Sequence, residues 1–410
     1  MFKISSTASN QELVLAKATT FAKPKVSTKQ ALTYLYRCFR ILGLYRTEKY
    51  KNAYIIYCIV IHCCVTIFLP ASFIASYSLE SNKSLDYDTL FTSIQVAINV
   101  IGCSMKICML LYFIPHLLTA EPVMAKLDER CIAEDEIELL FKIKNLGRKL
   151  VVNFSITFWS YATSTFIVSM LAGHPPYSLY LPRINWRNSR WEYFVASFIE
   201  FLLMDAACFQ QVANDSYAAV YVCILRAHVN ILRLRIRKLG SDPQKTLQEN
   251  EEELKMCIKD HKNLIELYKI ISPVISATIF LQFTNTAGIL GITLINMLIF
   301  ARDYSSIIAS CFYVLAVVVE IFPLCYYANC LVCDSDLLSV EIFHSTWIQQ
   351  NAHYRKMLIF FMQRSQQTMQ LMAAKMFPIN LNSFISIAKF SFSLYTLIKK
   401  MGIKERMGLE

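Results

Sequence analysis

Charged residues and glycine are scarce in this chain of 410 residues. Asp, Glu, Lys and Arg together make up 17% of the sequence and glycine occurs nine times, whereas hydrophobic residues make up 55%. A soluble globular domain has roughly 25% charged and about 45–50% apolar residues, so the composition excludes a soluble multidomain protein. The excess apolar surface is expected to face lipid.

A continuous basic face and the common enzyme motifs are also missing. The formal net charge is +11, but Lys and Arg lie in blocks between uncharged runs, which disfavours nucleic-acid binding and is typical of membrane topology. The sequence contains no phosphate-binding glycine loop, GxSxG or HExxH, and its seven histidines lack ligand spacing. We therefore expect no catalysis, no metal and no cofactor. No internal repeat or matched pair of broken helices indicates a transporter.

Long apolar runs are what the sequence does contain. Three runs have no Asp, Glu, Lys or Arg, and each exceeds the roughly 20 residues that cross a hydrocarbon core of about 30 Å: Asn52–Leu79, Val151–Pro182 and Ile270–Ala301. Four further segments carry only isolated charges and are also predicted to span the membrane: Thr89–Leu118, Tyr193–Leu225, Ser305–Val332 and Lys356–Ile398. Pro378 lies inside the last one and predicts a cytoplasmic helix before it and a shorter membrane helix after it.

Loop charge predicts the orientation. No apolar leader precedes Asn52, so residues 1–51 are expected to stay in the cytoplasm. With this orientation 27 basic residues fall on the cytoplasmic side and nine on the outside, in agreement with the positive-inside rule. The predicted fold class is therefore an all-α polytopic membrane protein with seven transmembrane helices, a cytoplasmic N-terminus and an extracellular C-terminus. This plan is the inverse of a G-protein-coupled receptor.

The expected organisation follows from these spans. A cytoplasmic region (1–51) precedes a seven-helix domain (52–398), and residues 399–410 form an external tail. Charged helical continuations predict cytoplasmic anchor segments at 226–269 and 345–377, and residues 378–398 are predicted to form a pore-lining half-helix. Asn82 begins an Asn-Lys-Ser glycosylation acceptor in the first external loop, where use and chance occurrence are equally plausible. The 14 cysteines all fall in spans or cytoplasmic stretches, as expected for packing residues.

Polar residues recur along one face of the last span. Steps of four, three, four, three and four connect Asn382, Ser386, Lys389, Ser393, Thr396 and Lys400, a set we call the polar stripe. One interpretation is the lining of a pore, which a single helix cannot enclose and which therefore predicts a ring of subunits. The other is a helix packed inside the protein, with its hydroxyls bonded to neighbouring carbonyls.

The C-terminal residues also resemble a known family. The resemblance rests on Trp347, Tyr354-Arg355-Lys356, Met362–Gln366, Phe377–Leu381 and Lys389–Leu397, which match the C-terminal signature of insect odorant receptors in order and spacing. Upstream, Pro175–Tyr177 through Pro182 and Trp186 resemble the second external loop of that family.

Three departures refine the resemblance. The family often has Ser-Tyr-Ser where this chain has Ser391-Phe392-Ser393, which puts any role of that hydroxyl in doubt. The Thr-Tyr…Gln-Phe ending of gustatory receptors is missing. The connection around Gly240–Pro243 is short, whereas the shared co-receptor carries a long insertion there. The chain therefore resembles a ligand-tuning subunit.

The resemblance implies a function. It implies a subunit of a heteromeric, odorant-gated, non-selective cation channel, a heterotetramer with the co-receptor, which binds a small volatile ligand in the plasma membrane of olfactory sensory neuron dendrites. Two alternatives remain at this point: a seven-helix chemoreceptor that acts through G proteins, and a gustatory-type homomeric ligand-gated channel.

The resemblance also nominates site residues. It places the gate near Tyr395, with Ile398 and Lys399 one turn outward and Ser391 and Thr396 beside it. Tyr395 lies on nearly the opposite face from the polar stripe, so both faces stay candidates for the pore. The expected ligand-binding residues are Phe91, Ile94, Trp159, Thr163, Phe166, Phe201, Met204, Phe312 and Tyr313, although for each one singly core packing is the stronger explanation, by about two to one.

Charged residues inside the spans are expected to pair. Asp205 and Glu320 are costly in hydrocarbon, and Lys106 is a candidate partner for either of them. Asp215 is expected where the fourth helix emerges into the cytoplasm.

Overall fold

The structure, a computed structural model, is almost entirely helical. It describes residues 27–45, 51–79, 87–173, 175, 177, 179–297 and 304–400. The elements in order are η1 (Thr28–Leu32), α2 (Thr33–Ile41), α3 (Lys51–Ile61), η2 (His62–Phe68), α4 (Leu69–Leu79), α5 (Tyr87–Leu118), α6 (Ala120–Glu129), α7 (Glu134–Ala172), α8 (Arg190–Lys238), α9 (Leu247–Ile295), α10 (Tyr304–His344), α11 (Ala352–Ser365), β1 (Met372–Ala373), β2 (Phe377–Pro378) and α12 (Leu381–Lys400). Asn82 and the tail from residue 401 onward lie outside the described residues.

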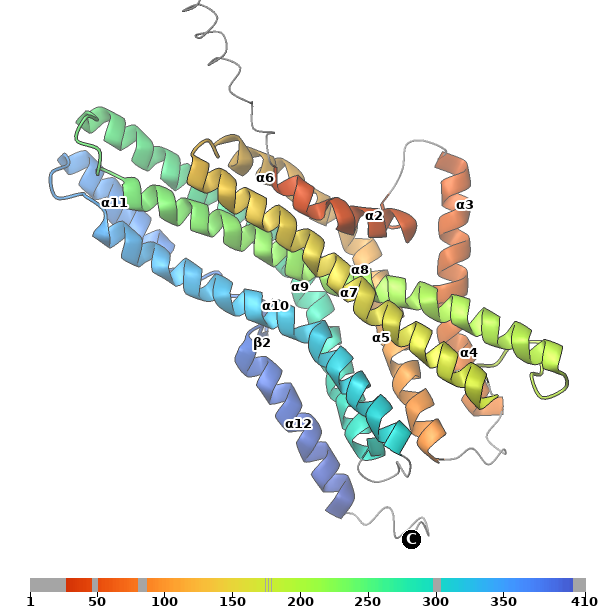
Figure 1. The fold of residues 1–410 in the computed structure, drawn as a ribbon. Coiled ribbons are helices and arrows are strands. Elements are labelled where there is room, and N and C mark those ends of the chain that lie inside the picture. The colour runs from red at the N-terminus through yellow and green to blue at the C-terminus, as the bar shows by residue number, and fades with distance from the viewer. Residues whose placement is uncertain are drawn as a thin grey trace, which may run out of the picture.

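Two helices are far longer than a membrane is thick. Helices α8 and α9 each have 49 residues, roughly 70 Å at 1.5 Å per residue, against a hydrocarbon core of about 30 Å. Both begin at side-chain caps: Ser189 accepts from the backbone of Glu192, and Thr246 forms a capping box with Glu249. Together with α7 and α10 they run as long rods through the molecule (Figure 1), so the membrane bundle continues into a second, charged bundle.

The seven spans are present with shifted boundaries. Six stretches of helix in the described residues are long and apolar enough to cross a membrane. Helix α8 is the seventh, and it differs because Glu200, Asp205 and Asp215 interrupt its apolar sequence. The predicted span Val151–Pro182 ends earlier, since α7 stops at Ala172 and Gly173 adopts a left-handed conformation with φ of 76°.

The last predicted segment contains a break of its own. Helix α11 ends at Ser365 rather than continuing to Ala374, and β1 and β2 then form a small antiparallel hairpin in which Met372 pairs with Pro378. The turn residues Ala374 and Lys375 have positive φ, and the Ala374 amide donates to the Ser276 carbonyl of α9 at 3.0 Å. Pro378 closes the hairpin, and α12 begins three residues later. Helix α12 stands at the opposite end of the molecule from α11 (Figure 1).

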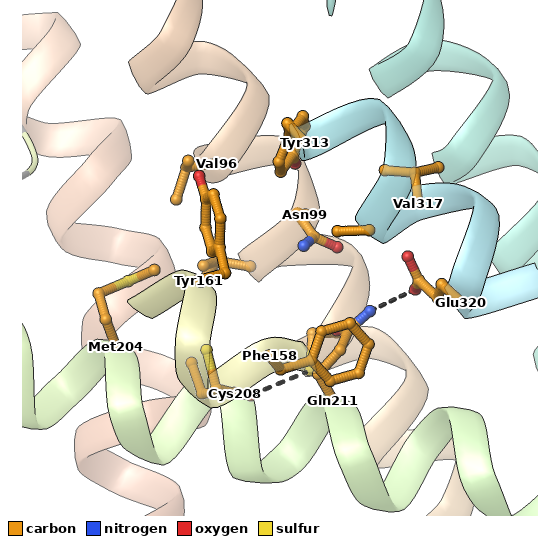
Figure 2. A pocket seen from close by; sticks show the side chains of 14 residues that line it. Val96, Asn99, Phe158, Tyr161, Met204, Cys208, Gln211, Tyr313, Val317 and Glu320 are labelled. Carbon is orange, nitrogen blue, oxygen red and sulfur yellow. Dashed lines mark hydrogen bonds between the residues drawn. The ribbon is translucent and has the colours of Figure 1, made fainter. Parts of the chain in front are cut away.

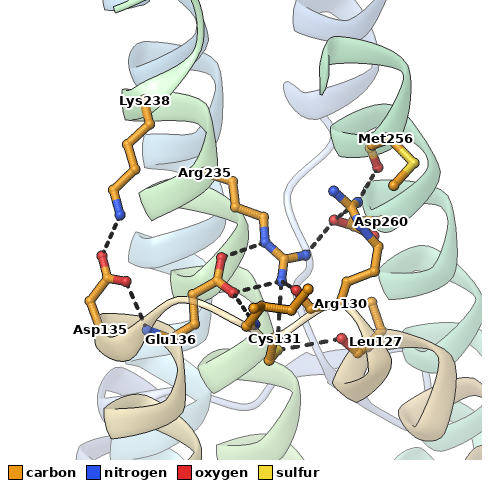
Figure 3. Close-up of polar contacts among 10 residues, drawn as sticks. Leu127, Arg130, Cys131, Asp135, Glu136, Arg235, Lys238, Met256 and Asp260 are labelled. Atoms are coloured by element: carbon orange, nitrogen blue, oxygen red, sulfur yellow. Dashed lines mark hydrogen bonds and ion pairs between the residues drawn. The ribbon is translucent and has the colours of Figure 1, made fainter. Parts of the chain in front are cut away.

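Ion pairs hold the charged bundle together. Arg235 of α8 binds Glu136 through two hydrogen bonds of 2.7 and 3.1 Å and binds Asp260 of α9 at 2.6 Å (Figure 3). Arg130, at the end of α6, reaches the same Asp260 and also donates to the carbonyl of Met256. The guanidinium of Arg235 thus bridges the start of α7 to α9. We refer to Arg130, Glu136, Arg235 and Asp260 as the arginine clasp.

Candidate functional site

A small cavity lies within the membrane bundle, between α5, α7, α8 and α10. Its volume is about 50 Å³, and its lining is mostly apolar and aromatic (Figure 2). The lining residues are Val96, Asn99, Val100 and Cys103 of α5, Phe158 and Tyr161 of α7, Met204, Ala207, Cys208 and Gln211 of α8, and Tyr313, Ala316, Val317 and Glu320 of α10. A cavity with apolar walls and a few placed polar groups is typical of small-molecule sites.

The cavity floor is a buried network of charges and amides. Lys106 of α5 is 2% exposed, donates to Asp215 at 2.8 Å and lies 3.5 Å from Glu320. The amides of Gln211 and Gln282 both donate to Glu320, and Lys106 also donates to Gln282. Four helices thus meet at one ammonium group, whose two carboxylate partners offset its desolvation. We refer to Lys106, Asp215, Glu320, Gln211 and Gln282 as the Lys106 network.

The contacts in the Lys106 network test two predictions made from the sequence. The expected pairing of Lys106 with Glu320 is confirmed. The expected position of Asp215 at the cytoplasmic end of the span is wrong: Asp215 is buried in the bundle, because Lys106 supplies the opposite charge that its burial requires. Asp205 does not pair with Lys106 and instead accepts a hydrogen bond from the Trp159 indole.

An external loop covers the outer side of the cavity. Tyr177 is buried and packs in one cluster with Val96, Val100 and Met204, which line the cavity. Its backbone amide donates to the buried carboxylate of Glu200 at 3.0 Å, and the loop is fixed again where the Ser72 hydroxyl donates to the carbonyl of Tyr180 at 2.8 Å. Tyr177, Leu179 and Leu181 of this loop are therefore part of the packed core of the bundle.

The nine predicted ligand residues divide into those at the cavity and those elsewhere. Met204 and Tyr313 line it. Phe166 and Phe201 pack against each other, with ring centroids 4.6 Å apart, and Ile94 is half-buried; all three lie outside the lining. Trp159, Thr163 and Phe312 are exposed on the outer surface of the bundle. Phe91 lies on α5, and its side chain is outside the described part of the structure. Ligand contact stays a prediction for each of them.

The predicted ligand residues and the cavity lining differ mainly in which face of each helix they occupy. The prediction names Trp159 on α7, whereas its neighbour Phe158 lines the cavity, and on α10 it names Phe312 beside the lining residue Tyr313. Both faces of a membrane helix are apolar, so hydrophobic periodicity gives no phase. A usable signal was the spacing of polar residues: Gln211 and Glu320 lie on the same face as Cys208 and Tyr313, at helical steps of three and seven.

Helix α12 presents two different faces. Ser391 and Tyr395 are buried against the rest of the chain, and the Ser391 hydroxyl lies 2.9 Å from the carbonyl of Ile387 and 3.3 Å from that of Ala287 on α9. Thr396 and Ile398 are half-buried, and the ammonium of Lys399 lies 6.0 Å from the ring centroid of Tyr395.

The polar stripe occupies the other face. Asn382, Ser386, Lys389, Ser393 and Lys400 are exposed, and Thr396 is half-buried. Of the two predicted pore faces, the first turns Ser391 and Tyr395 into the subunit but leaves Lys399 exposed, and the polar stripe turns mostly out of the subunit.

No metal-binding arrangement was found where the structure describes the chain: its His, Cys, Asp and Glu side chains form no group of three or more suited to hold an ion.

These features define a class: a seven-helix membrane receptor with a small-molecule cavity inside the bundle. Comparison with known proteins makes the class specific, since residues 86–392 match the family model described as 7tm Odorant receptor. The chain belongs to the odorant receptor family.

The similarity to individual relatives extends over nearly the whole chain. Odorant receptor 42b of Drosophila melanogaster is 35% identical over 92% of this chain and 95% of that protein, and odorant receptor 42a is 34% identical over 93% and 94%. The solved insect olfactory receptor OR5 from Machilis hrabei has the same fold, with a TM-score of 0.74 and 13% identity over 90% of this chain and 98% of that one. The predicted seven-helix fold, the resemblance to insect odorant receptors and the ligand-tuning subunit type are therefore confirmed.

Proposed function

We propose that this chain is the odorant-binding subunit of a ligand-gated, non-selective cation channel that assembles with a co-receptor in the plasma membrane of olfactory sensory neuron dendrites. The observation that carries the proposal is the cavity in the bundle, because helix α9 contacts both the network at its floor and the polar-faced helix α12. The fold is shared with OR5 of Machilis hrabei, which has also been solved in complex with eugenol, a small volatile phenol.

Helix α9 supplies a physical connection between cavity and pore helix. Gln282 of α9 belongs to the Lys106 network. Ala287 and Gly291, five and nine residues further along α9 toward its outer end, contact α12: the Ala287 carbonyl accepts from Ser391, and Gly291 lies so close to Leu394 that an added Cβ would meet its methyl at 2.6 Å. A shift of α9 on ligand binding would therefore move α12 directly.

The small volume of the cavity suggests how ligand binding changes the structure. Pockets for drug-sized ligands measure roughly 300–1,000 Å³ and an engineered cavity of about 150 Å³ takes up benzene, so the 50 Å³ of this cavity is less than a ligand of that size needs. An odorant has to push the four lining helices apart. The ligand then favours the expanded arrangement by its differential affinity, and α9 carries that expansion to α12.

The outer face of α12 suits the wall of a shared pore. Apolar residues flank the polar stripe on both sides, with Ile385 and Phe392 on one and Phe390 and Leu397 on the other, all exposed. In a ring of subunits the flanks pack against neighbouring helices while the stripe lines water. The short connection around Gly240 distinguishes this chain from a co-receptor, which we propose completes the ring.

The proposal is tested by recording odorant-evoked currents from cells that express this chain, the co-receptor, or both. We expect a cation current only with both, and we expect it to persist in excised patches without nucleotides or G proteins. Current that needs GTP would establish the G-protein alternative instead, and current from this chain alone would establish a homomeric channel.

A pair of variants links the current to the cavity. Val317→Phe fills the cavity and should abolish the response, whereas Leu315→Phe adds a ring to the outer surface of the same helix and should preserve it. Equal responses from the two variants at equal surface expression would contradict the proposed binding site.

A further inference from the structure

One polar atom in the cavity lining has no partner. Tyr313 is 6% exposed, and its hydroxyl is the only buried polar side-chain atom in the described lining without a hydrogen bond. Buried hydroxyls are almost always bonded, because leaving one unsatisfied costs about 1–3 kcal/mol. A group absent from the isolated chain is expected to complete this bond.

The amide and carboxylate side chains of the lining already have hydrogen-bond partners. Gln211 donates to Glu320, Glu320 accepts a second amide from Gln282, and Asn99 accepts from the Asn285 amide at 3.4 Å. Each of these side chains therefore has at least one hydrogen-bond partner inside the protein, whereas the Tyr313 hydroxyl is buried without one.

The surroundings of Tyr313 disfavour water as the missing partner. It packs in an apolar cluster with Ile289, Leu290 and Val317, and its ring lies 5.6 Å from that of Tyr161 (Figure 2). A buried water needs two to four polar partners, and this cluster offers few. The acceptor therefore has to arrive on an otherwise apolar molecule.

The charge of the floor excludes one class of ligand. Lys106 is shared between Asp215 and Glu320, so the three formal charges sum to −1 and no free cation faces the cavity. A carboxylate odorant would be repelled and desolvated without a counter-charge.

We infer that the cavity selects uncharged odorants that carry a hydrogen-bond acceptor oxygen, such as a carbonyl, on an apolar body, and that the Tyr313 hydroxyl is the donor which recognises that oxygen. The inference rests on the proposed function, in that it takes the cavity to be the odorant site.

Matched probes test the acceptor requirement without recording any current. The purified chain in lipid nanodiscs is titrated with 2-pentanone, 2-heptanone and 2-nonanone, each beside the alkene in which a CH₂ group replaces the carbonyl oxygen. Thermal stabilisation reports binding. We expect at least one ketone to bind about fivefold or more tightly than its alkene, as one added hydrogen bond implies. Equal stabilisation by ketone and alkene in every pair, or by neither, would overturn the inference.

A single substitution assigns the donor. Tyr313→Phe removes only the hydroxyl and should weaken ketone binding about fivefold while leaving alkene binding unchanged. Tyr326→Phe is the control, since Tyr326 lies on the same helix, is exposed and is remote from the lining. Unchanged ketone binding by Tyr313→Phe would exclude Tyr313 as the donor, and unchanged alkene binding shows that the variant is folded.

The two proposals fail in different ways. If the chain binds ketones in nanodiscs but gives no odorant-evoked current with the co-receptor, the channel function fails and the ligand class stands. If currents are evoked equally by ketones and alkenes, the channel stands and the ligand class fails.

Discussion

At the scale of single residues, Lys106 is the most constrained side chain in the membrane bundle. It is fully buried, and its ammonium contacts Asp215, Glu320 and Gln282, which lie on three different helices. Removing one member of a buried ion cluster leaves the others charged and desolvated, which costs more than the cluster itself contributes to stability. The positions of α5, α8, α9 and α10 around the cavity therefore depend on this residue.

We predict that Lys106→Met destabilises the protein by about 3–5 kcal/mol, because two carboxylates are left without a counter-charge. The measurement is the melting temperature of the purified protein in nanodiscs. Adding Asp215→Asn and Glu320→Gln to the same chain should restore most of the loss. Lys142→Met, at an exposed position of α7, is the control. If Lys106→Met has the same melting temperature as Lys142→Met, the Lys106 network does not stabilise the fold.

Two buried histidines outside the membrane make stability depend on pH. Burial lowers the pKa of His261 to about 4, with a further contribution from the nearby guanidinium of Arg364, and burial lowers the pKa of His228 to about 4 as well, aided by Arg235. The unfolded chain binds these protons near pH 6.5. Between pH 6.5 and 4 the unfolded state therefore holds more protons than the folded state and is favoured as the pH falls.

We predict a melting temperature that is constant above about pH 7 and falls as the pH decreases from 6.5 to 5. Each histidine contributes up to about 1.4 kcal/mol per pH unit in this window. His261→Gln should remove about half of the slope. His353→Gln, on an exposed residue, should leave it intact. A slope unchanged by His261→Gln would show that His261 does not titrate in this way.

At the scale of elements, the charged bundle is held by salt bridges of very different value. Arg235 in the arginine clasp is 11% exposed and contacts two carboxylates and the Arg130 carbonyl (Figure 3). Arg237, two residues further along α8, contacts Glu341 but is 53% exposed. Solvent screens the second pair and leaves the first almost unscreened.

We predict that Arg235→Ala lowers stability by about 3 kcal/mol, because Glu136 and Asp260 stay buried without their main partner. Arg237→Ala should cost less than about 1 kcal/mol. The same melting assay compares them, repeated at high salt, where only the effect of Arg237 should shrink. If both variants lose a similar amount of stability, burial does not determine how much each salt bridge contributes.

The positions of the membrane spans could be predicted from the sequence. Which side of each helix faces the cavity could not. Uncharged runs such as Ile270–Ala301 must cross the membrane, and loop charge orients them, so the number of spans and their direction followed from composition. The lining of the cavity did not follow, since Phe158 and Trp159 are both aromatic neighbours on an apolar helix and only packing decides which one turns inward. The hairpin after Ser365 was missed because two-residue strands have no periodicity.

At the scale of the whole molecule, the single chain is incomplete as a channel. The polar stripe of α12 is exposed, and its central member, Lys389, would be costly against lipid. Several α12 helices around one axis would place the stripe in water, with cations passing the lysines. A heteromer holds fewer copies of Lys389 than a homomer, so the penalty on cation passage depends on how many subunits of this type the ring contains.

This gives a prediction for the assembled channel. A lysine roughly 10 Å from a passing cation in water raises its energy by about 0.4 kcal/mol, a factor of about two in rate. We therefore expect Lys389→Gln, coexpressed with the co-receptor, to raise unitary cation conductance about twofold for each copy in the ring. Lys399→Gln is the matched control. This variant should leave conductance unchanged, because the Lys399 ammonium lies beside the buried ring of Tyr395 and away from the polar stripe. If Lys399→Gln raises conductance and Lys389→Gln does not, the Tyr395 face lines the pore, and α12 must rotate by about half a turn when the subunits assemble.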